Sequence, residues 1–319
     1  MSVVSLTAVV WWALHQRAPR LPASVAGLLL LALALFVYAL VTAARGVRWH
    51  EILRAAGVRA SMADTQGLIV VGYMGNTVLP LRGGELLRVL LLGRRTDSSR
   101  VTIVGTLVAE RLLDVLALVA MLLLLAFATA SGVRGVFELS LAAAIVLLLL
   151  ALALSTGRRL SRSWRLRGLR PHVDSLTLAS RNLLSAQGVL LALLTAIVWM
   201  GEGCIYWLIG RALSLRVDLL QGCFLVVLSS LVAAIPAAPG YAGTYDAAIQ
   251  LGLRALHVPG GGAVAFGLLV RMVIFLPITV VGLLLVVVRY GGLASLRRPQ
   301  WRDAQATVDE PATVVGVVK

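Results

Sequence analysis

The sequence predicts an all-α fold: a polytopic transmembrane helix bundle with two oppositely oriented re-entrant hairpins, arranged as an inverted repeat. Composition is the first reason. Of the 319 residues, 60% are hydrophobic and 13% are charged, whereas charged residues make up about a quarter of a soluble domain. The second reason is that several apolar segments are long enough to cross a bilayer. The third is that two more apolar segments end in proline and glycine clusters, which break helices.

Five segments are expected to span the hydrocarbon core of a bilayer, which is about 30 Å thick. The two broken segments differ, because their clusters "TVLPLRGG" and "AAIPAAPGYAG" free backbone groups that lipid cannot hydrogen-bond. Backbone of this kind must be covered by protein or face a water-filled cavity. The expected spans are 24–44, 101–130, 136–156, 187–208 and 262–288, and the broken segments are 65–81 and 219–239.

An interfacial helix is expected between the first span and the first break. The stretch "RGVRWHEILRAAGVRAS" has Trp49, Ile52, Leu53 and Ala56 on one helical face, with arginines around them. A helix with one apolar face and a basic surround is typical of a segment that lies in the membrane surface.

Arginine counts predict the topology of a multi-pass protein of the cell membrane. The net charge is +15, and Lys319 is the only lysine. The segments 45–60, 82–100, 157–185 and 289–302 hold 20 arginines, whereas 1–23, 131–135, 209–218 and 240–259 hold 6. The positive-inside rule therefore predicts that the first group and the C-terminus are cytoplasmic. Both broken segments must then return to the side they left, one from each face.

The same topology divides the chain into three parts. We expect an extracytoplasmic segment at 1–23, a transmembrane domain at 24–290 and a polar cytoplasmic tail at 291–319. Because an N-terminus outside the cell without a targeting span is unusual, we expect that a first helix is missing.

A weak internal repeat supports the two hairpins. The stretches "VLPLRGGELLR" at 78–88 and "AAPGYAGTYDAAI" at 237–249 share a proline, a glycine and an acidic residue. Pro80 and Pro239 are 159 positions apart, and Arg111 and Arg271 are 160 apart. Two copies in opposite orientation form an inverted repeat, whose substrate site usually lies where the copies meet near mid-membrane.

Three charged residues lie within the expected span 101–130. Glu110 and Asp114 share a helical face, and Arg111 is placed to pair with Asp114 three positions later. Each charge near a helix centre costs about 2.5–3.5 kcal/mol on insertion scales. Two explanations remain open: the residues snorkel to the cytoplasmic surface, or they pair inside the bundle near a site.

The first break carries a candidate phosphate receptor. Arg82 and Arg88 lie beside loosened backbone N–H groups, an arrangement that suits an anion, and an arginine fork binds two phosphate oxygens at once. Glu85 could hold one guanidinium in place, and Asn76 could cap or bridge the broken helix. The alternative is an ordinary loop with solvated charges.

The second break has its own acidic residue, Asp246, in "PGYAGTYD". Tyr241 and Tyr245 are either interfacial aromatics, which are common at both membrane faces, or part of a site. Glu202 and Arg271 are lone charges in their spans, so they could pair with each other, pair with Asp246 or contact a ligand.

These residues resemble the transmembrane region of the lysylphosphatidylglycerol synthase/flippase family, over about residues 24 to 290. The resemblance rests on Asn76, Pro80, Arg82, Gly84, Glu85 and Arg88, then Glu110, Arg111 and Asp114, and in the second stretch Pro236, Pro239, Gly240, Gly243 and Asp246, with Arg271 beyond. It implies movement of phospholipids between leaflets, and bifunctional members flip an aminoacylated phosphatidylglycerol that their own synthase domain makes. The chain departs from the family at Asp246, where glutamate is more frequent. Residues 291–319 are expected to form a polar tail and not a synthase domain, so the resemblance implies the stand-alone membrane module.

We therefore expect a lipid flippase or scramblase-like transporter for an anionic or aminoacylated phospholipid, or a related lipid-linked phosphate. In this hypothesis four arginines neutralise the phosphate, and four carboxylates orient the arginines or attract a cationic headgroup. The arginines are Arg82, Arg88, Arg111 and Arg271, and the carboxylates are Glu85, Glu110, Asp114 and Asp246. The predicted substrate-binding set also includes Asn76, Pro80, Gly84, Pro239, Gly240, Gly243 and Tyr245.

Two alternatives remain: a membrane-embedded lipid-modifying transferase, or a partner subunit of a glycosyltransferase or synthase. Neither the H-E-x-x-H nor the G-x-S-x-G motif occurs, and without a P-loop nucleotide-driven pumping by this chain alone is not expected. Cys204 and Cys223 are isolated, so no metal or other cofactor is expected. The arginines are read as a topology signal, so no nucleic-acid partner is expected. The oligomeric state is left open.

Overall fold

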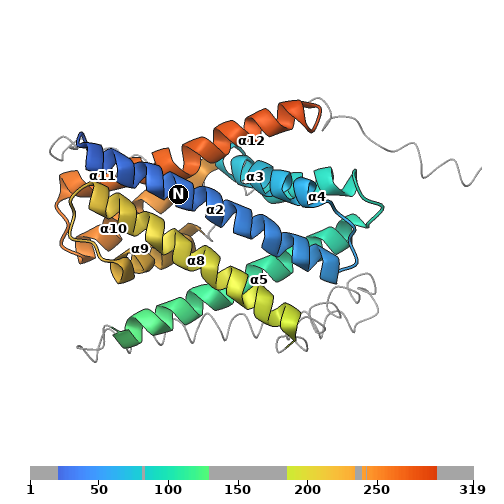
Figure 1. Cartoon of the computed structure of the whole chain (residues 1–319), viewed down its shortest axis with the longest axis horizontal. Helices are drawn as coiled ribbons and strands as arrows, with labels where there is room; N and C mark the ends of the chain where they lie inside the picture. The colour runs from blue at the N-terminus through green and yellow to red at the C-terminus, as the bar shows by residue number, and fades with distance from the viewer. Residues whose placement is uncertain (1–20, 81–82, 129–184, 234–238, 242, 293–319) are drawn as a thin grey trace, which may run out of the picture.

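A computed structural model describes residues 21–80, 83–128, 185–233, 239–241 and 243–292 (Figure 1). These residues form helices without any strand, which confirms the all-α prediction. The helices are α2 (Val25–Ala55), α3 (Met62–Val78), α4 (Gly83–Gly93), α5 (Arg100–Ala128), α8 (Ala186–Ala212), α9 (Leu219–Ala233), the 3₁₀ turn η2 (Pro239–Tyr241), α10 (Thr244–Ala255), α11 (Gly260–Val270), the π-helical turn η3 (Arg271–Phe275) and α12 (Leu276–Val288).

Three stretches of helix are long and apolar enough to cross a membrane: α2, α8 and the continuous run Gly260–Val288 from α11 to α12. They correspond to three of the five expected spans. The expected span 101–130 is the helix α5, which has 29 residues and carries the three predicted interior charges. The expected span 136–156 lies outside the described residues.

The prediction of an interfacial helix is wrong. Residues 45–55 continue α2 without a break, and Trp49 and Leu53 are fully buried rather than exposed on one face. They pack in a core with Leu68 and Ile69 of α3 and Leu92 of α4. The apolar face of residues 45–55 is therefore not exposed at a membrane surface. It continues the core-facing side of α2, and α3, α4 and α5 cover it.

The described helices repeat one order of lengths, long, short, short, long. In the first half, α2, α3, α4 and α5 have 31, 17, 11 and 29 residues. In the second half, α8, α9, α10 and the run Gly260–Val288 have 27, 15, 12 and 29 residues. In both halves the two short helices pack against each other.

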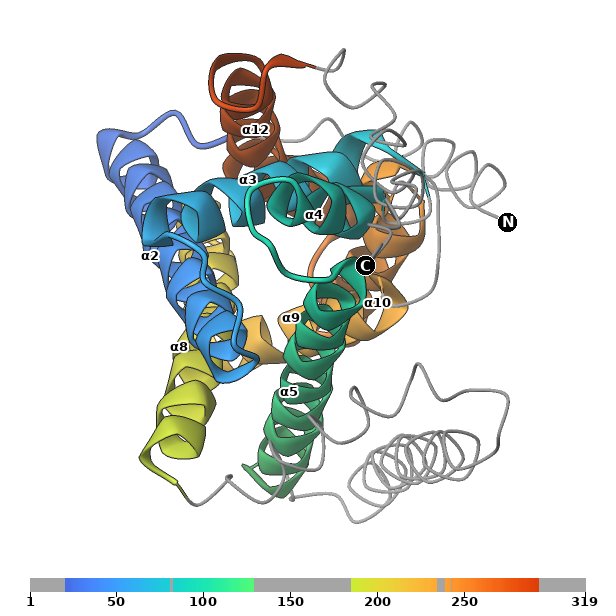
Figure 2. The ribbon, with the colours of Figure 1, turned by 90° about the vertical axis from the view of Figure 1, so that its right-hand side faces the viewer.

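Packing between the halves is reciprocal. The first helices of the two halves, α2 and α8, run side by side (Figure 1). The last helix of each half contacts the first short helix of the other, because α12 lies along α3 and α5 contacts α9 (Figure 2). Close approach depends on glycine at these seams: a Cβ at Gly201 would lie 2.4 Å from Val41, and one at Gly282 would lie 2.3 Å from Met74.

The first break is a compact turn between α3 and α4. The Leu79 N–H bonds to the Gly75 carbonyl, and the Gly83 N–H bonds to the Pro80 carbonyl. The side chain of Asn76 then crosses the break, because its Oδ1 accepts the Gly84 N–H at 3.0 Å. Of the two roles left open for Asn76, bridging the broken helix is therefore confirmed.

Gly84 allows α4 to lie directly on α3. A Cβ at this position would lie 1.8 Å from the Gly72 carbonyl oxygen and 2.7 Å from the Asn76 backbone nitrogen. Backbone atoms cannot move aside as the end of a flexible side chain can, so only glycine fits.

The substitution Gly84→Ala should destabilise the protein by about 1–3 kcal/mol, the usual cost of overpacking a close contact. Thermal unfolding of purified protein in detergent measures this loss. Gly267→Ala is the matched control, because the nearest atom to its Cβ is the end of the Gln250 side chain at 3.4 Å. Equal melting temperatures for the two variants would contradict the close α3–α4 contact.

An exposed ionic cluster ties the start of α3 to the ends of α4 and α12. Asp64 pairs with Arg95 and, at 3.0 Å, with Arg289, and the Arg95 guanidinium stacks on the Tyr290 ring. Burial alone would raise the pKa of the Asp64 carboxyl. Hydrogen bonds from Ser61 and Arg289, together with the charge of Arg95, outweigh it and hold the pKa below its usual value.

Asp64 should therefore stabilise the fold at neutral pH and lose this effect in acid. A carboxyl whose pKa is lower in the folded state contributes stability above its unfolded pKa, and the contribution disappears as pH falls through the folded value. Asp64→Asn should lower the melting temperature at pH 7 and by progressively less below about pH 4. The exposed Asp97 is the control, because Asp97→Asn should leave the melting temperature at pH 7 unchanged.

Candidate functional site

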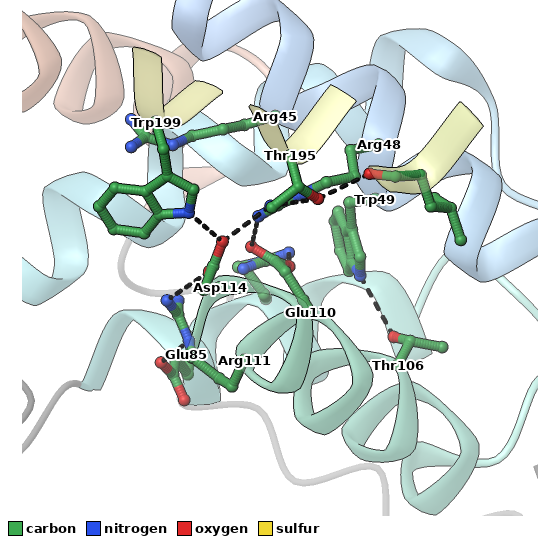
Figure 3. A network of polar contacts seen from close by, with 12 residues as sticks. Arg45, Arg48, Trp49, Glu85, Thr106, Glu110, Arg111, Asp114, Thr195 and Trp199 are labelled. Carbon is green, nitrogen blue, oxygen red and sulfur yellow. Dashed lines mark hydrogen bonds and ion pairs between the residues drawn. The ribbon is translucent and has the colours of Figure 1, made fainter. Parts of the chain in front are cut away.

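Six side chains form a chain of alternating charges inside the bundle, here called the charge network. It runs from Arg88 of α4 through Glu110 of α5, Arg48 of α2 and Asp114 of α5 to Arg111 of α5 and Glu85 of α4. Figure 3 shows Arg48 reaching from α2 toward the carboxylates on α5. The expected pairing of Arg111 with Asp114 is confirmed, at 3.3 Å.

Arg48 is the centre of the charge network and is fully buried. Its Nη1 donates to Asp114 Oδ1 at 2.7 Å and to Thr195 Oγ1 of α8 at 3.2 Å. Its Nη2 lies 3.6 Å from Glu110 Oε1, near enough for an ion pair but too far for a hydrogen bond. Arg48 thus holds α2, α5 and α8 together.

Arg88 and Glu110 form the closed end of the charge network. The Arg88 Nη2 donates to Glu110 Oε2 at 2.6 Å, and both side chains are at most 3% exposed. The Arg88 guanidinium also stacks 3.9 Å from the ring of Trp49, whose indole N–H bonds to Thr106 at 3.2 Å. In this conformation the positive charge of Arg88 is neutralised by Glu110 and is not accessible to a ligand.

Arg111 and Glu85 form the open end. Their side chains are 35% and 28% exposed, and Arg111 Nε donates to Glu85 Oε1 at 3.1 Å. The expectation that Glu85 holds a guanidinium is confirmed. Asp114 anchors this end, because it also accepts the indole N–H of Trp199 at 3.2 Å.

A separate buried ion pair joins α2 to α8. Arg45 Nη2 donates to Glu202 Oε1 at 2.7 Å, and the Arg45 guanidinium lies over the ring of Tyr73. Glu202 therefore does not pair with Arg271, one of the alternatives left open for it. Its partner is an arginine that was counted with the cytoplasmic loop.

At the second break, backbone that requires glycine positions an ion pair between Asp246 and Arg271. Gly240 and Gly243 have φ values of +63° and +85°, a region that favours glycine. The Gly243 N–H bonds to Asp246 Oδ2 at 3.1 Å at the start of α10. Arg271 then binds Asp246 with both ends of its fork, at 2.9 and 2.6 Å, and the Gly240 carbonyl at 3.3 Å. Of the alternatives left open for Arg271, the structure shows pairing with Asp246.

The π-helical turn Arg271–Phe275 places this arginine in the middle of the run Gly260–Val288. One extra residue per turn rotates the helix locally, and such turns are frequent at functional sites. Phe275 packs against the ring of Tyr245 at 5.3 Å and lies under the Arg271 guanidinium.

Tyr245 belongs to a buried hydroxyl cluster rather than to an interfacial belt. Its hydroxyl bonds to that of Tyr206 in α8, which in turn lies 3.3 Å from the Ser229 hydroxyl in α9. The cluster joins three helices of the second half.

The second break lies against the end of α3, next to the first break. A Cβ at Gly240 would lie 3.3 Å from the carbonyl oxygen of Thr77, in the last turn of α3. Through the Gly240 carbonyl, Arg271 is therefore connected to the backbone beside the first break. Arg82 and Pro236 lie outside the described residues.

Sequence reasoning missed Arg45, Arg48, Thr195 and Trp199. Both arginines were read as topology signals, although Arg45 and Arg48 continue the face of α2 that buries Tyr38 and Val41. The three- and four-residue spacing of Tyr38, Val41, Arg45 and Arg48 could have indicated that both arginines face the core. Arg45, Arg48 and Arg88 form interior ion pairs and should not be counted as topology signals. Without them the expected cytoplasmic segments hold 17 arginines instead of 20, against 6 in the expected extracytoplasmic segments.

Charges balance among the ion pairs of the described interior. Five arginines meet five carboxylates, so a net charge of zero is buried there. The arginines are Arg45, Arg48, Arg88, Arg111 and Arg271, and the carboxylates are Glu85, Glu110, Asp114, Glu202 and Asp246. Among the described residues, no group of three His, Cys, Asp or Glu side chains could hold a metal ion.

Comparison with known proteins identifies the family. The sequence model described as Lysylphosphatidylglycerol synthase TM region matches residues 1–282. The chain belongs to this family. The resemblance based on the two broken stretches is thus confirmed, and the protein is a membrane protein of the lysylphosphatidylglycerol synthase TM region family.

Three curated relatives match parts of the chain. UPF0104 membrane protein MJ1078 of Methanocaldococcus jannaschii is 25% identical over 212 residues, which are 65% of this chain and 90% of that protein. Glycosyltransferase AglD of Haloferax volcanii is 30% identical over 128 residues, 40% of this chain and 19% of AglD. UPF0104 membrane protein PH1989 of Pyrococcus horikoshii is 24% identical over 127 residues, 39% of this chain and 38% of that protein. No solved structure matches the chain significantly.

The substitution Arg48→Ala should destabilise the fold by about 3–5 kcal/mol, because it removes one partner from a buried ionic cluster and leaves Asp114 and Glu110 without one of their cationic partners. Chemical unfolding in detergent measures this change. Arg54→Ala is the control at an exposed pair, where Arg54 is 66% exposed and bound to Glu51, and it should cost at most about 1 kcal/mol. Equal losses would contradict a structural role for the charge network.

Proposed function

We propose that this protein is a lipid flippase or scramblase-like transporter that moves an anionic or aminoacylated phospholipid, or a related lipid-linked phosphate, between leaflets. The observation that carries the proposal is the contact of the second helix break, at Gly240, with Thr77 at the end of α3 beside the first break, next to the Asp246–Arg271 pair. Charges in a membrane interior are costly and usually functional. A transporter lowers the cost of moving a charged headgroup through hydrocarbon.

In this proposal the two pairs of short helices are re-entrant hairpins. At about 1.5 Å per residue, a helix needs about 20 residues to cross the hydrocarbon core. The short helices α3, α4, α9 and α10 have 17, 11, 15 and 12 residues. None of the four is long enough to cross by itself, which supports hairpins that enter and return.

The proposed inverted repeat is supported by the recurring order of helix lengths and by the reciprocal contacts of α12 with α3 and of α5 with α9. Exchanging the two halves maps one of these contacts onto the other. With 17 arginines against 6 after the interior residues are removed, the positive-inside rule still favours a cytoplasmic C-terminus in the cell membrane.

The predicted substrate-binding residues take different roles in the proposal. Arg111 and Arg271 receive the phosphate, because their ion pairs are partly exposed. Asn76, Gly84, Gly240 and Gly243 shape the broken backbone around them. Arg88, Glu110 and Asp114 are buried in the charge network, so they hold Arg111 and its helix in position.

A second candidate function is a partner of a lipid-linked glycosyltransferase or another lipid-modifying enzyme. The similarity to Glycosyltransferase AglD over 128 residues favours it, although only 19% of AglD is covered. Product chemistry separates the two. Mass spectrometry of lipids incubated with the purified protein should detect a new species if the chain modifies them, whereas transport changes only their leaflet.

Reconstituted protein should exchange fluorescent phosphatidylglycerol or phosphatidylethanolamine between the leaflets of liposomes, measured by dithionite quenching. Arg271→Ala should slow exchange roughly tenfold or more, since a hydrogen bond to a charged group is worth about 1.5–3 kcal/mol. Arg271→Lys should recover only part of the rate, because lysine lacks the bidentate fork. The exposed Arg211 at the end of α8 provides the control Arg211→Ala. Wild-type protein that is folded but exchanges no lipid would refute the proposal.

A further inference from the structure

Two ion pairs, Glu85–Arg111 and Asp246–Arg271, are built in the same way in the two halves. Each carboxylate belongs to the third residue of the helix that follows a break, α4 starting at Gly83 and α10 starting at Thr244. Each arginine lies in the long helix that follows, 26 residues later in the first half and 25 in the second. The recurrence of one construction at two places indicates one task for both pairs.

These two pairs are also the accessible ones among the described interior ion pairs. Arg111 and Glu85 are 35% and 28% exposed, and Arg271 and Asp246 are 29% and 14% exposed. Side chains in the other interior pairs, apart from Arg111 itself, are at most 11% exposed. A ligand can therefore reach these two arginines without opening the buried part of the charge network.

Each arginine keeps a second partner that does not depend on the carboxylate. Arg111 Nη1 donates to Asp114 Oδ2 at 3.3 Å, and Asp114 is itself held by Arg48 and Trp199. Arg271 Nη1 donates to the Gly240 carbonyl, also at 3.3 Å. If Glu85 or Asp246 releases its arginine, the guanidinium stays in place and its charge becomes available.

We propose that Arg111 and Arg271 are two masked phosphate receptors, one in each half, and that Glu85 and Asp246 occupy them until a phosphate group replaces the carboxylate. The inference rests on the proposed function for its physiological ligand, a lipid headgroup. A carboxylate and a phosphate present similar pairs of oxygens to a guanidinium fork, so the two groups compete for the same donors. The masking keeps each arginine paired while the site is empty, which avoids an uncompensated charge in the membrane.

Neutralising the masking carboxylate tests this proposal, because it should strengthen anion binding. Glu85→Gln and Asp246→Asn keep the size of the side chain, and the amide introduced by Asp246→Asn retains an oxygen for the Gly243 N–H. Each variant should bind dihexanoylphosphatidylglycerol roughly fivefold tighter than wild type, the factor expected from removing a partly exposed ion pair. Isothermal titration calorimetry on the purified full chain in detergent measures the binding. A misfolded variant would not produce tighter binding.

Matched variants control for general effects of charge. Glu202→Gln removes a carboxylate from the buried Arg45 pair and should leave binding unchanged, because that arginine is not accessible. Arg111→Ala and Arg271→Ala should each weaken binding, and adding Glu85→Gln to Arg111→Ala should restore nothing. If Glu85→Gln and Asp246→Asn bind no tighter than wild type, or if Glu202→Gln tightens binding equally, the proposal is wrong.

Inorganic phosphate and dihexanoylglycerol identify the source of the ligand. If the two variants gain affinity only for the phospholipid, the receptors bind lipid headgroups. If they gain affinity equally for inorganic phosphate, the receptors bind free phosphate. Either result supports masked phosphate receptors. A gain for the uncharged dihexanoylglycerol would overturn them. Liposome exchange measured on the same variants separates the two proposals: tighter binding without exchange refutes only transport, and exchange without tighter binding refutes only the masking.

Discussion

The need to pair every guanidinium that is buried between the helices organises this structure. Arg48 meets the need by joining α2 to two carboxylates of α5 and to Thr195 of α8. Because these groups are fully or almost fully buried, a shift of any one helix would leave a charge without a partner. The ion pairs therefore fix the relative positions of helices that apolar contacts alone would let slide, since lipid tails are as apolar as the helix faces.

The side chains of the charge network differ in solvent exposure, and this difference separates the residues that support the fold from those that a ligand can reach. Arg88, Glu110 and Arg48 are closed off from solvent, whereas Arg111 and Glu85 are partly exposed. The closed part gives the open part a rigid support, as a binding site requires. In the second half, Asp246 and Arg271 have no comparable network among the described residues, and glycine-dependent backbone at Gly240 and Gly243 provides the support instead.

Much of the site could be read from the sequence because its residues violate local expectations. Charges in an apolar helix, such as Arg111 and Asp114, and glycines beside proline in an apolar segment are visible without a fold. Pairings within one helix, and the bridge from Asn76 across a short turn, followed from spacing. Arg45 and Arg48 were missed because they lie near the end of a spanning helix, where an arginine is ordinarily a topology signal.

The sequence by itself determined that this is an all-α membrane protein of its family with two helix breaks, because hydropathy, helix length and proline–glycine clusters are local properties. Only the tertiary structure decided which charge meets which: that Glu202 pairs with Arg45, that Arg48 joins Asp114 to Glu110, and that Gly240 lies against Thr77. Partners such as Arg45 and Glu202 are 157 residues apart. Their pairing depends on how whole helices pack, which no local pattern specifies.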